Sequence, residues 1–205
     1  MKKALVVGAT GTIGSAVSKT FQQAGYQVTG TSRNTPPGID IEDSGSVAEF
    51  FAGSDVYDVI ICAAGTASFG ALEKLEEEDF QKSFNSKLMG QIRLVKHGLA
   101  KLKPGGTLLL TGGIFSHDPW PQTSALAMVN AGLEGFVRSA STEIGQNKIL
   151  AIIHPPFIAE TAKKSGMDPT PWPGADIAGQ AYLKAVAEAA NGDHLFFENY
   201  HPKVR

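Results

Sequence analysis

The sequence predicts an α/β fold in which a doubly wound parallel sheet carries helices on both faces. Short apolar segments alternate with longer segments of helical period along the 205 residues, and glycine or proline stands at most of the junctions. Successive parallel strands need crossover connections, and right-handed crossovers cover both faces of the sheet with helices. The length is that of one globular domain, so we expect a single domain over residues 1–205.

The first half of the chain predicts three strands and two helices. The apolar run 5–7 predicts the first strand, and a glycine turn leads from it into a helical period over 13–24. Gly25 ends that helix, and a run rich in strand-forming residues follows at 26–30. A short helix that ends before Gly53 comes next, and a third apolar run predicts the third strand; we expect these two elements over 46–52 and 59–62.

The second half continues the alternation. A Pro-Gly-Gly turn at 104–106 separates a long helical period from the fourth strand. The proline-rich segment 161–174 is irregular and follows the last inner strand, which is where a lid over a substrate would lie. The remaining helices are expected over 77–102, 124–145 and 176–190, and the remaining strands over 107–110, 150–153 and 195–197.

Composition narrows the function classes. The 18 basic and 20 acidic residues give a net charge of −2 without a basic block, so we expect neither nucleic acid nor a membrane surface as a partner. The single Cys62 has no partner for a disulfide or a thiolate metal site, and no histidines stand at metal-ligand spacing. Without a secretory or membrane-spanning stretch, the sequence predicts a cytoplasmic protein with no metal.

A glycine-rich turn after the first strand predicts a dinucleotide-binding domain of Rossmann type. Glycine permits the tight turn and the close approach of a pyrophosphate, and the following helix N-terminus supplies N–H donors to it. The residues expected to form this cradle are Gly8, Thr10, Gly11, Thr12, Ile13 and Gly14.

The end of the second strand indicates which dinucleotide binds. Proteins specific for NAD carry an acid there, whereas this chain has Ser32, Arg33 and Asn34. Arg33 can pair with a 2′-phosphate in a fork, or it can be a solvated surface arginine; the first reading predicts NADP(H). Asp40 and Ile41 are expected to hold the adenine, unless Asp40 only caps a helix or faces solvent.

With these motifs the chain resembles the short-chain dehydrogenase/reductase family over nearly its whole length. The resemblance adds Ala63, Ala64 and Gly65 in a Cys-Ala-Ala-Gly sequence, and Asn85 within Phe-Asn-Ser-Lys-Leu. It also implies that the segment after the fifth strand walls the nicotinamide, with the family's Pro-Gly replaced here by a sequence that contains Pro155, Phe157 and Ile158. Relatives pair through the two long helices, which implies a homodimer or homotetramer.

The family's Ser–Tyr–Lys catalytic residues are not found at their expected positions. The alignment puts Gly113 at the serine, Leu126 at the tyrosine and Asn130 at the lysine. Leucine carries no exchangeable proton, and asparagine lacks the positive charge that lowers the pKa of a neighbouring phenol. Of the family's catalytic set, Asn85 alone remains.

Other residues are therefore needed to supply a proton. His117 follows Gly113 in a loop that in relatives lines the substrate pocket, and histidine titrates nearest neutral pH. Thr111 is the nearest remaining hydroxyl, and we expect Thr111 or a water held by Asn85 to orient His117. The alternative is that His117 is an exposed loop histidine.

Three function classes follow from these residues. The first is an NADPH-dependent oxidoreductase that acts on a small carbonyl, imine or activated alkene with a non-standard proton donor. The second is a non-catalytic NADP(H)-binding sensor or regulator, and the third is an isomerase or lyase that uses the same pocket. The expected lid over 161–174 favours the first, because a sensor needs no substrate lid.

Overall fold

Six parallel strands form one sheet in the order β2-β1-β3-β4-β5-β6, in a computed structural model that describes residues 1–145 and 147–200. The predicted doubly wound α/β class is confirmed. Each predicted strand is present, with bounds that differ by a few residues: β1 (Lys3–Val7), β2 (Gln27–Thr31), β3 (Tyr57–Cys62), β4 (Leu102–Thr111), β5 (Ile149–His154) and β6 (His194–Phe196).

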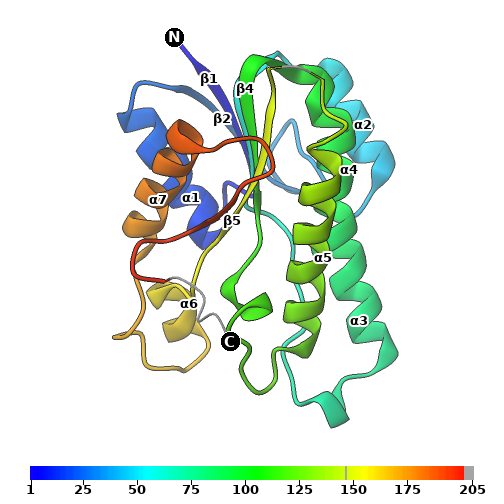
Figure 1. The fold of residues 1–205 in the computed structure, drawn as a ribbon, viewed down its shortest axis with the longest axis vertical. Coiled ribbons are helices and arrows are strands. Elements are labelled where there is room, and N and C mark those ends of the chain that lie inside the picture. The colour runs from blue at the N-terminus through cyan, green and yellow to red at the C-terminus, as the bar shows by residue number, and fades with distance from the viewer. Residues whose placement is uncertain (146, 201–205) are drawn as a thin grey trace.

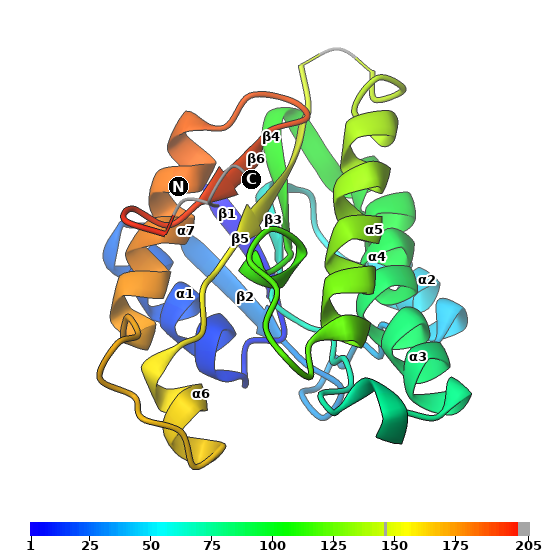
Figure 2. The same cartoon turned by 60° about the horizontal axis from the view of Figure 1, so that its bottom comes forward.

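Helices cover both faces of this sheet (Figure 1). Helices α1 and α7 lie on one face, and α2, α4 and α5 lie on the other, as Figure 2 also shows. Their bounds are α1 (Thr12–Gln23), α2 (Ser44–Gly53), α3 (Glu77–Ser83), α4 (Gly90–Gly98), α5 (Ser124–Ala140), α6 (Ala159–Lys164) and α7 (Ala175–Glu188).

Two hydrophobic cores result from the alternation of side chains along the strands. Leu5 and Val7 of β1 point into the core under α2, α4 and α5, whereas Ala4 and Val6 point into the core under α1 and α7. All four side chains are almost fully buried. The inner strands are apolar on both faces for this reason, which is the pattern that predicted the parallel sheet.

The helix predicted over 77–102 is wrong as a single α-helix. It divides into α3, a π-helical segment over Phe84–Met89, α4 and a 3-10 turn over Leu99–Lys101. Apolar periodicity does not separate α from π turns, because one inserted residue shifts the register only locally. Strand β4 then begins at Leu102 and runs through the Pro-Gly-Gly sequence predicted as a turn.

Three short elements follow the inner strands without a counterpart in the prediction. One 3-10 turn spans Leu72–Lys74 after β3, another spans Ile114–Ser116 after β4, and α6 follows β5. The segment 161–174 is therefore helical as far as Lys164, and its irregular part is shorter than expected.

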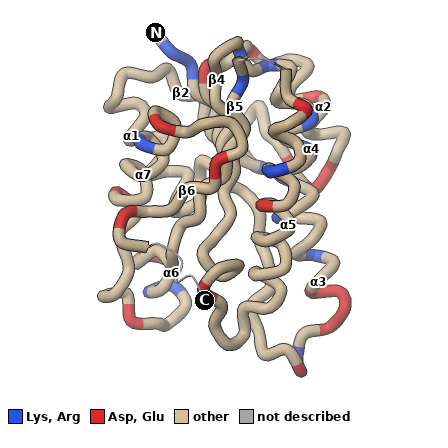
Figure 3. The backbone as a smooth tube through the Cα atoms, viewed as in Figure 1, with Lys and Arg blue, Asp and Glu red and all other residues tan. Residues whose placement is uncertain are grey.

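Acidic and basic residues are scattered over the molecule (Figure 3). The acidic run at the start of α3 is an exception; it lies in the first turn, where the helix dipole stabilises negative charge. Within residues 1–145 and 147–200, the helices are too short or too polar to cross a lipid bilayer.

Candidate active site

A cavity of about 400 Å³ opens where β1, β2 and β3 end. The strand order reverses direction between β1 and β3, and ligands of open α/β sheets bind outside the carboxyl ends of strands at such a point. The cavity brings together most of the predicted cofactor residues. Its lining comprises Val7, Gly8, Thr10, Gly11, Ser32, Arg33, Asn34, Ile39, Asp40, Ile41, Glu42, Ala63, Ala64, Gly65, Thr66 and Ser86.

The glycine turn has no room for side chains. Gly8 has a φ of +88°, and a Cβ there would stand 2.6 Å from the carbonyl oxygen of Ala63. A Cβ at Gly14 would stand 2.1 Å from the carbonyl oxygen of Gly8. The turn is fixed to β2, because the amides of Gly8 and Ala9 donate to the Thr31 carbonyl at 2.8 and 3.1 Å.

Helix α1 begins directly after this turn. Its N-cap is Gly11, which has no side chain to accept the first helical N–H groups, and its first turn carries no acidic residue. These N–H groups are therefore available to an anion. Thr12, Ile13 and Gly14 lie in the first turn of the helix, beside the cavity rather than in its lining.

Arg33 lies at the far end of the cavity between two carboxylates. Its Nε is 3.9 Å from Asp40 Oδ2, and its terminal nitrogen is 3.8 Å from Glu42 Oε1. These are long ion pairs of a side chain that is 64% exposed, so they hold the guanidinium weakly. Glu42 was not predicted; its Oε1 also accepts a hydrogen bond from the Ser86 hydroxyl at 2.9 Å.

The π-helical segment places Asn85 differently from the prediction, and it also positions Lys87, which was not predicted as a site residue. The Asn85 amide oxygen accepts from Arg93 at 2.7 Å, which ties it to α4 rather than to the cavity. Lys87 instead donates from Nζ to the carbonyl of Gly112 at 2.9 Å. Its backbone lies against Gly65, where a Cβ would stand 2.9 Å from Lys87 Cα. Burial lowers the pKa of Lys87 to about 8.

Thr111 does not fit the role expected of it. Its hydroxyl donates to the Cys62 carbonyl at 2.6 Å and contacts the Tyr182 hydroxyl at 2.7 Å. Because strand residues alternate, Thr111 points to the same face as Leu109, toward α7. Tyr182 is fully buried there, and burial raises the pKa of its phenol.

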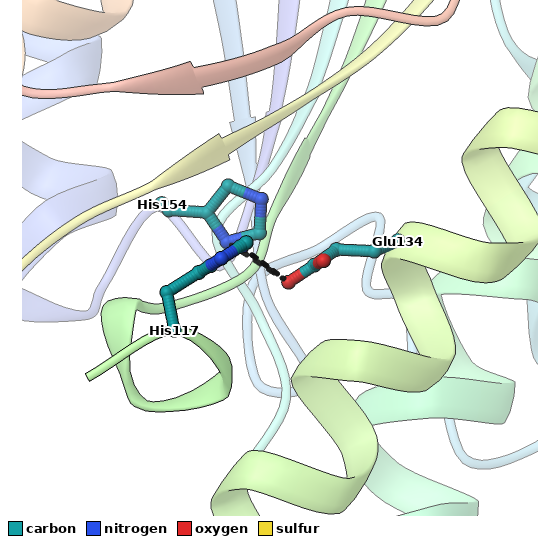
Figure 4. A group of neighbouring side chains, drawn as sticks. All are labelled: His117, Glu134 and His154. Atoms are coloured by element: carbon teal, nitrogen blue, oxygen red, sulfur yellow. Dashed lines mark ion pairs between the residues drawn. The ribbon is translucent and has the colours of Figure 1, made fainter. Parts of the chain in front are cut away.

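His117 lies against Glu134, a residue that was not predicted to belong to the site. Its Nε2 is 3.0 Å from Glu134 Oε1, and His154 Nδ1 is 3.9 Å from the same oxygen (Figure 4). The expected partners, Thr111 and a water at Asn85, are thus replaced by a carboxylate of α5. His154 is fully buried, and burial lowers the pKa of its imidazole to about 4.

The residues after β5 anchor two loops. Phe157, Trp120 and Trp172 form an aromatic cluster with ring centroids 5.1 to 6.5 Å apart, which ties the segment 161–174 to the loop after β4. Ile158 is buried in the core under α7, and Pro155 accepts the Ile114 amide at 3.2 Å. None of Pro155, Phe157 and Ile158 lines the cavity described above.

Comparisons with known proteins agree with this fold. A family model described as "Enoyl-(Acyl carrier protein) reductase" matches residues 8–191. The protein lin1944 from Listeria innocua is 29% identical with a TM-score of 0.87, and the match covers 96% of this chain and 99% of that one. A small-chain dehydrogenase solved in complex with NADPH is 25% identical with a TM-score of 0.83, over 95% of both chains.

Curated relatives are more distant. The 2,3-dihydro-2,3-dihydroxybenzoate dehydrogenase of Escherichia coli K12 is 26% identical over 78% of this chain and 70% of its own length. The hydroxynaphthalene reductase-like protein Arp2 of Metarhizium brunneum is 29% identical, but the match spans only 45% of this chain and 35% of that protein. The family model covers most of the chain, and this chain therefore belongs to the short-chain dehydrogenase/reductase family of oxidoreductases, which use a nicotinamide cofactor.

Proposed function

We propose that this protein is an NADPH-dependent reductase of a small carbonyl, imine or activated alkene. The observation that carries the proposal is the cavity that joins the glycine turn and the start of α1 to Arg33. An anion-binding turn at one end and a guanidinium at the other suit a dinucleotide with an added phosphate. The NADPH complex of a related small-chain dehydrogenase supports the same choice.

The residues that would hold NADP(H) fit its parts. The N–H groups of Thr12 and Ile13 would bind the pyrophosphate, and Arg33 would turn from Asp40 and Glu42 to the 2′-phosphate. Asp40 and Ile41 would border the adenine, while Ala63, Ala64 and Gly65 would face the ribose beyond it. When bound, the cofactor supplies the hydride.

We further infer that the chain works without the family's Ser–Tyr–Lys set. Gly113, at the serine position, has its carbonyl bonded by the Asn130 amide at 3.3 Å, and a Cβ at Gly113 would stand 2.8 Å from that nitrogen. Asn130, at the lysine position, is buried and engaged in this contact. The hydroxyl of Tyr182 is committed to Thr111, so it does not replace the tyrosine.

Lys87 is the group best placed to deliver the proton. Its ammonium donates to the carbonyl of Gly112, one residue before the serine position, and no carboxylate of the described residues forms an ion pair with it. As hydride adds to the substrate carbon, negative charge grows on the oxygen. Lys87 would transfer a proton from Nζ to that oxygen and regain one from solvent.

His117 is the second candidate for this role. Its approach to Glu134 gives it the carboxylate partner that orients catalytic histidines. Its Nε2 atom, however, is shielded from solvent and turned to Glu134, whereas the Lys87 ammonium contacts the glycine pair after β4. We therefore assign proton delivery to Lys87.

The test is oxidation of NADPH with a panel of carbonyl, imine and enone substrates. Lys87→Met is expected to lower kcat about 10²–10⁴-fold, the usual value of general acid catalysis, while NADPH binding by calorimetry is kept. Lys82→Met is the matched control, because Lys82 is an exposed lysine of α3 paired only with Glu78. Loss of activity in His117→Ala but not in Lys87→Met would reverse the assignment.

The same panel separates the reductase from a sensor. Tight NADPH binding without turnover on any substrate, together with capture of a protein partner, would contradict the reductase and support a regulatory role. Conversion of a substrate without net NADPH oxidation would support an isomerase or lyase.

A further inference from the structure

Two histidines lie against a buried carboxylate beside the candidate active site. His117 comes from the loop after β4, Glu134 from α5 and His154 from the end of β5, as Figure 4 shows. Glu134 has a side chain only 7% exposed, and His154 is fully buried. A carboxylate is costly to bury unless positive charge or hydrogen bonds compensate it.

The ligand atoms of these residues converge. One atom from each of His117, Glu134 and His154 lies within 4.8 Å of the other two. Glu134 Oε1 is 3.0 Å from His117 Nε2 and 3.9 Å from His154 Nδ1. Nitrogen and oxygen ligands about 2.1 Å from a tetrahedral zinc stand about 3.4 Å from each other, a value between these two.

The cluster leaves the Nε2 atom of His117 without another use. In the described part of the chain, this atom is buried without a hydrogen-bond partner. His154 faces Glu134 through Nδ1, which also lies 3.2 to 3.3 Å from the backbone of Gly113, and its Nε2 is buried without a partner. His117 Nε2 approaches Glu134 Oε1 to 3.0 Å without making a hydrogen bond to it, so both atoms face the same point from two elements. A cation between them would convert that contact into two favourable bonds.

The neighbours of Glu134 support a ligand role for Oε1. The Ser116 hydroxyl donates to this oxygen at 2.5 Å, as outer-shell groups do for ligating carboxylates. Arg138 and His194 instead approach the other oxygen, Oε2, each at 3.9 Å. Arg138 is 61% exposed, so its charge is largely screened from the cluster.

We propose that His117, Glu134 and His154 form a binding site for a divalent transition metal of the Zn²⁺ type. Two imidazoles and a carboxylate are a ligand set that zinc takes with a fourth position open to water. The site would tie the loop after β4 to α5 and β5, next to Gly113. It lies outside the lining of the NADP(H) cavity and does not involve Lys87, the assigned proton donor.

The experiment is metal titration of the tag-free protein after removal of metals with a chelator. Calorimetry should show one saturable Zn²⁺ site, and Co²⁺ should give the intense visible bands of tetrahedral coordination. Mg²⁺ should not compete, because it prefers oxygen ligands. Zn²⁺ should also raise the melting temperature, with an increase that follows the logarithm of its concentration above Kd, without NADPH present.

Variants then test the ligands. His117→Ala and Glu134→Gln are expected to weaken Zn²⁺ more than about a hundredfold, and Ser116→Ala about 10–100-fold, as for outer-shell losses. His97→Ala, on α4, is the control and should bind as the wild type does. The His117 side chain is partly exposed, so His117→Ala should leave the core intact and circular dichroism should stay native. Absence of saturable binding to the wild type, or equal affinity in His117→Ala and His97→Ala, would overturn the proposal.

Discussion

The ion pairs of Arg33 with Asp40 and Glu42 are weak, so its guanidinium can turn away from them to bind a phosphate. Arg33→Ala is expected to weaken NADPH binding about 10–100-fold, because charge-assisted hydrogen bonds contribute about 1.5–3 kcal/mol, and to leave NADH binding nearly unchanged. Titration calorimetry with both cofactors measures this. Lys19→Ala, an exposed lysine of α1, controls for the change in net charge. Equal affinities of the wild type for NADPH and NADH would contradict the assignment.

The lowered pKa of Lys87 makes a pH dependence the second prediction at this scale. A proton donor must be protonated, so turnover should be high below about pH 8 and fall as the pH rises through that value. Burial sets the direction of the Lys87 pKa shift, because a buried site favours the neutral amine over the charged ammonium. Rates at saturating NADPH measure the profile. The residual rate of Lys87→Met should lack this decline, and a wild-type rate that stays flat to pH 9.5 would exclude Lys87 as the acid.

The element that depends most on close packing is the glycine turn with the start of α1. A Cβ at Gly14 would meet backbone atoms of Gly8 and Ala9, which cannot rotate away. Gly14→Ala should therefore destabilise the fold by about 1–3 kcal/mol and abolish NADPH binding. Thermal unfolding measures the first effect and calorimetry the second.

The matched control for that prediction is Gly53→Ala at the end of α2. Nothing lies within 4 Å of a Cβ there, so its stability should change by less than about 0.5 kcal/mol. Similar melting temperatures for the two variants would show that the turn adapts to a side chain.

Association is the prediction for the whole molecule. Small residues of α5 divide into two sets: Ala125 and Gly132 pack into this chain, Gly132 against Leu88, whereas Ala131 and Gly135 are exposed next to Met128. The exposed set forms a flat face on which a second α5 could pack, so we expect a homodimer or a homotetramer.

Light scattering at micromolar concentration measures the association. Gly135→Arg should yield monomers, because it places a charge on that face, and Gly53→Arg should leave the assembly unchanged. A wild type that is already monomeric would contradict the prediction.

Sequence alone determined the sheet, the order of its elements along the chain and the glycine turn after β1. These are local features: apolar runs buried on both faces, helical periods, and a turn where Gly8 and Gly14 leave no room for a Cβ. The Arg33 and Asp40 predictions depended on position after a strand, and the topology brought both to one cavity. Because strands and helices alternate regularly, residues that directly follow neighbouring strands can be predicted to lie at the same edge of the sheet.

Only the tertiary structure decided which side chains lie around the end of β4. Thr111 was expected near the substrate, yet the strand alternation turns it toward Tyr182. Lys87 comes to Gly112 through a π-helical segment, and Glu134 meets His117 and His154 although the three belong to a loop, a helix and a strand. The sequence predicts no metal, because these three residues lie far apart along the chain and do not match the spacing of a metal-binding motif. Side chains from separate elements meet only when packing sets their distances, and no pattern along the chain encodes those distances.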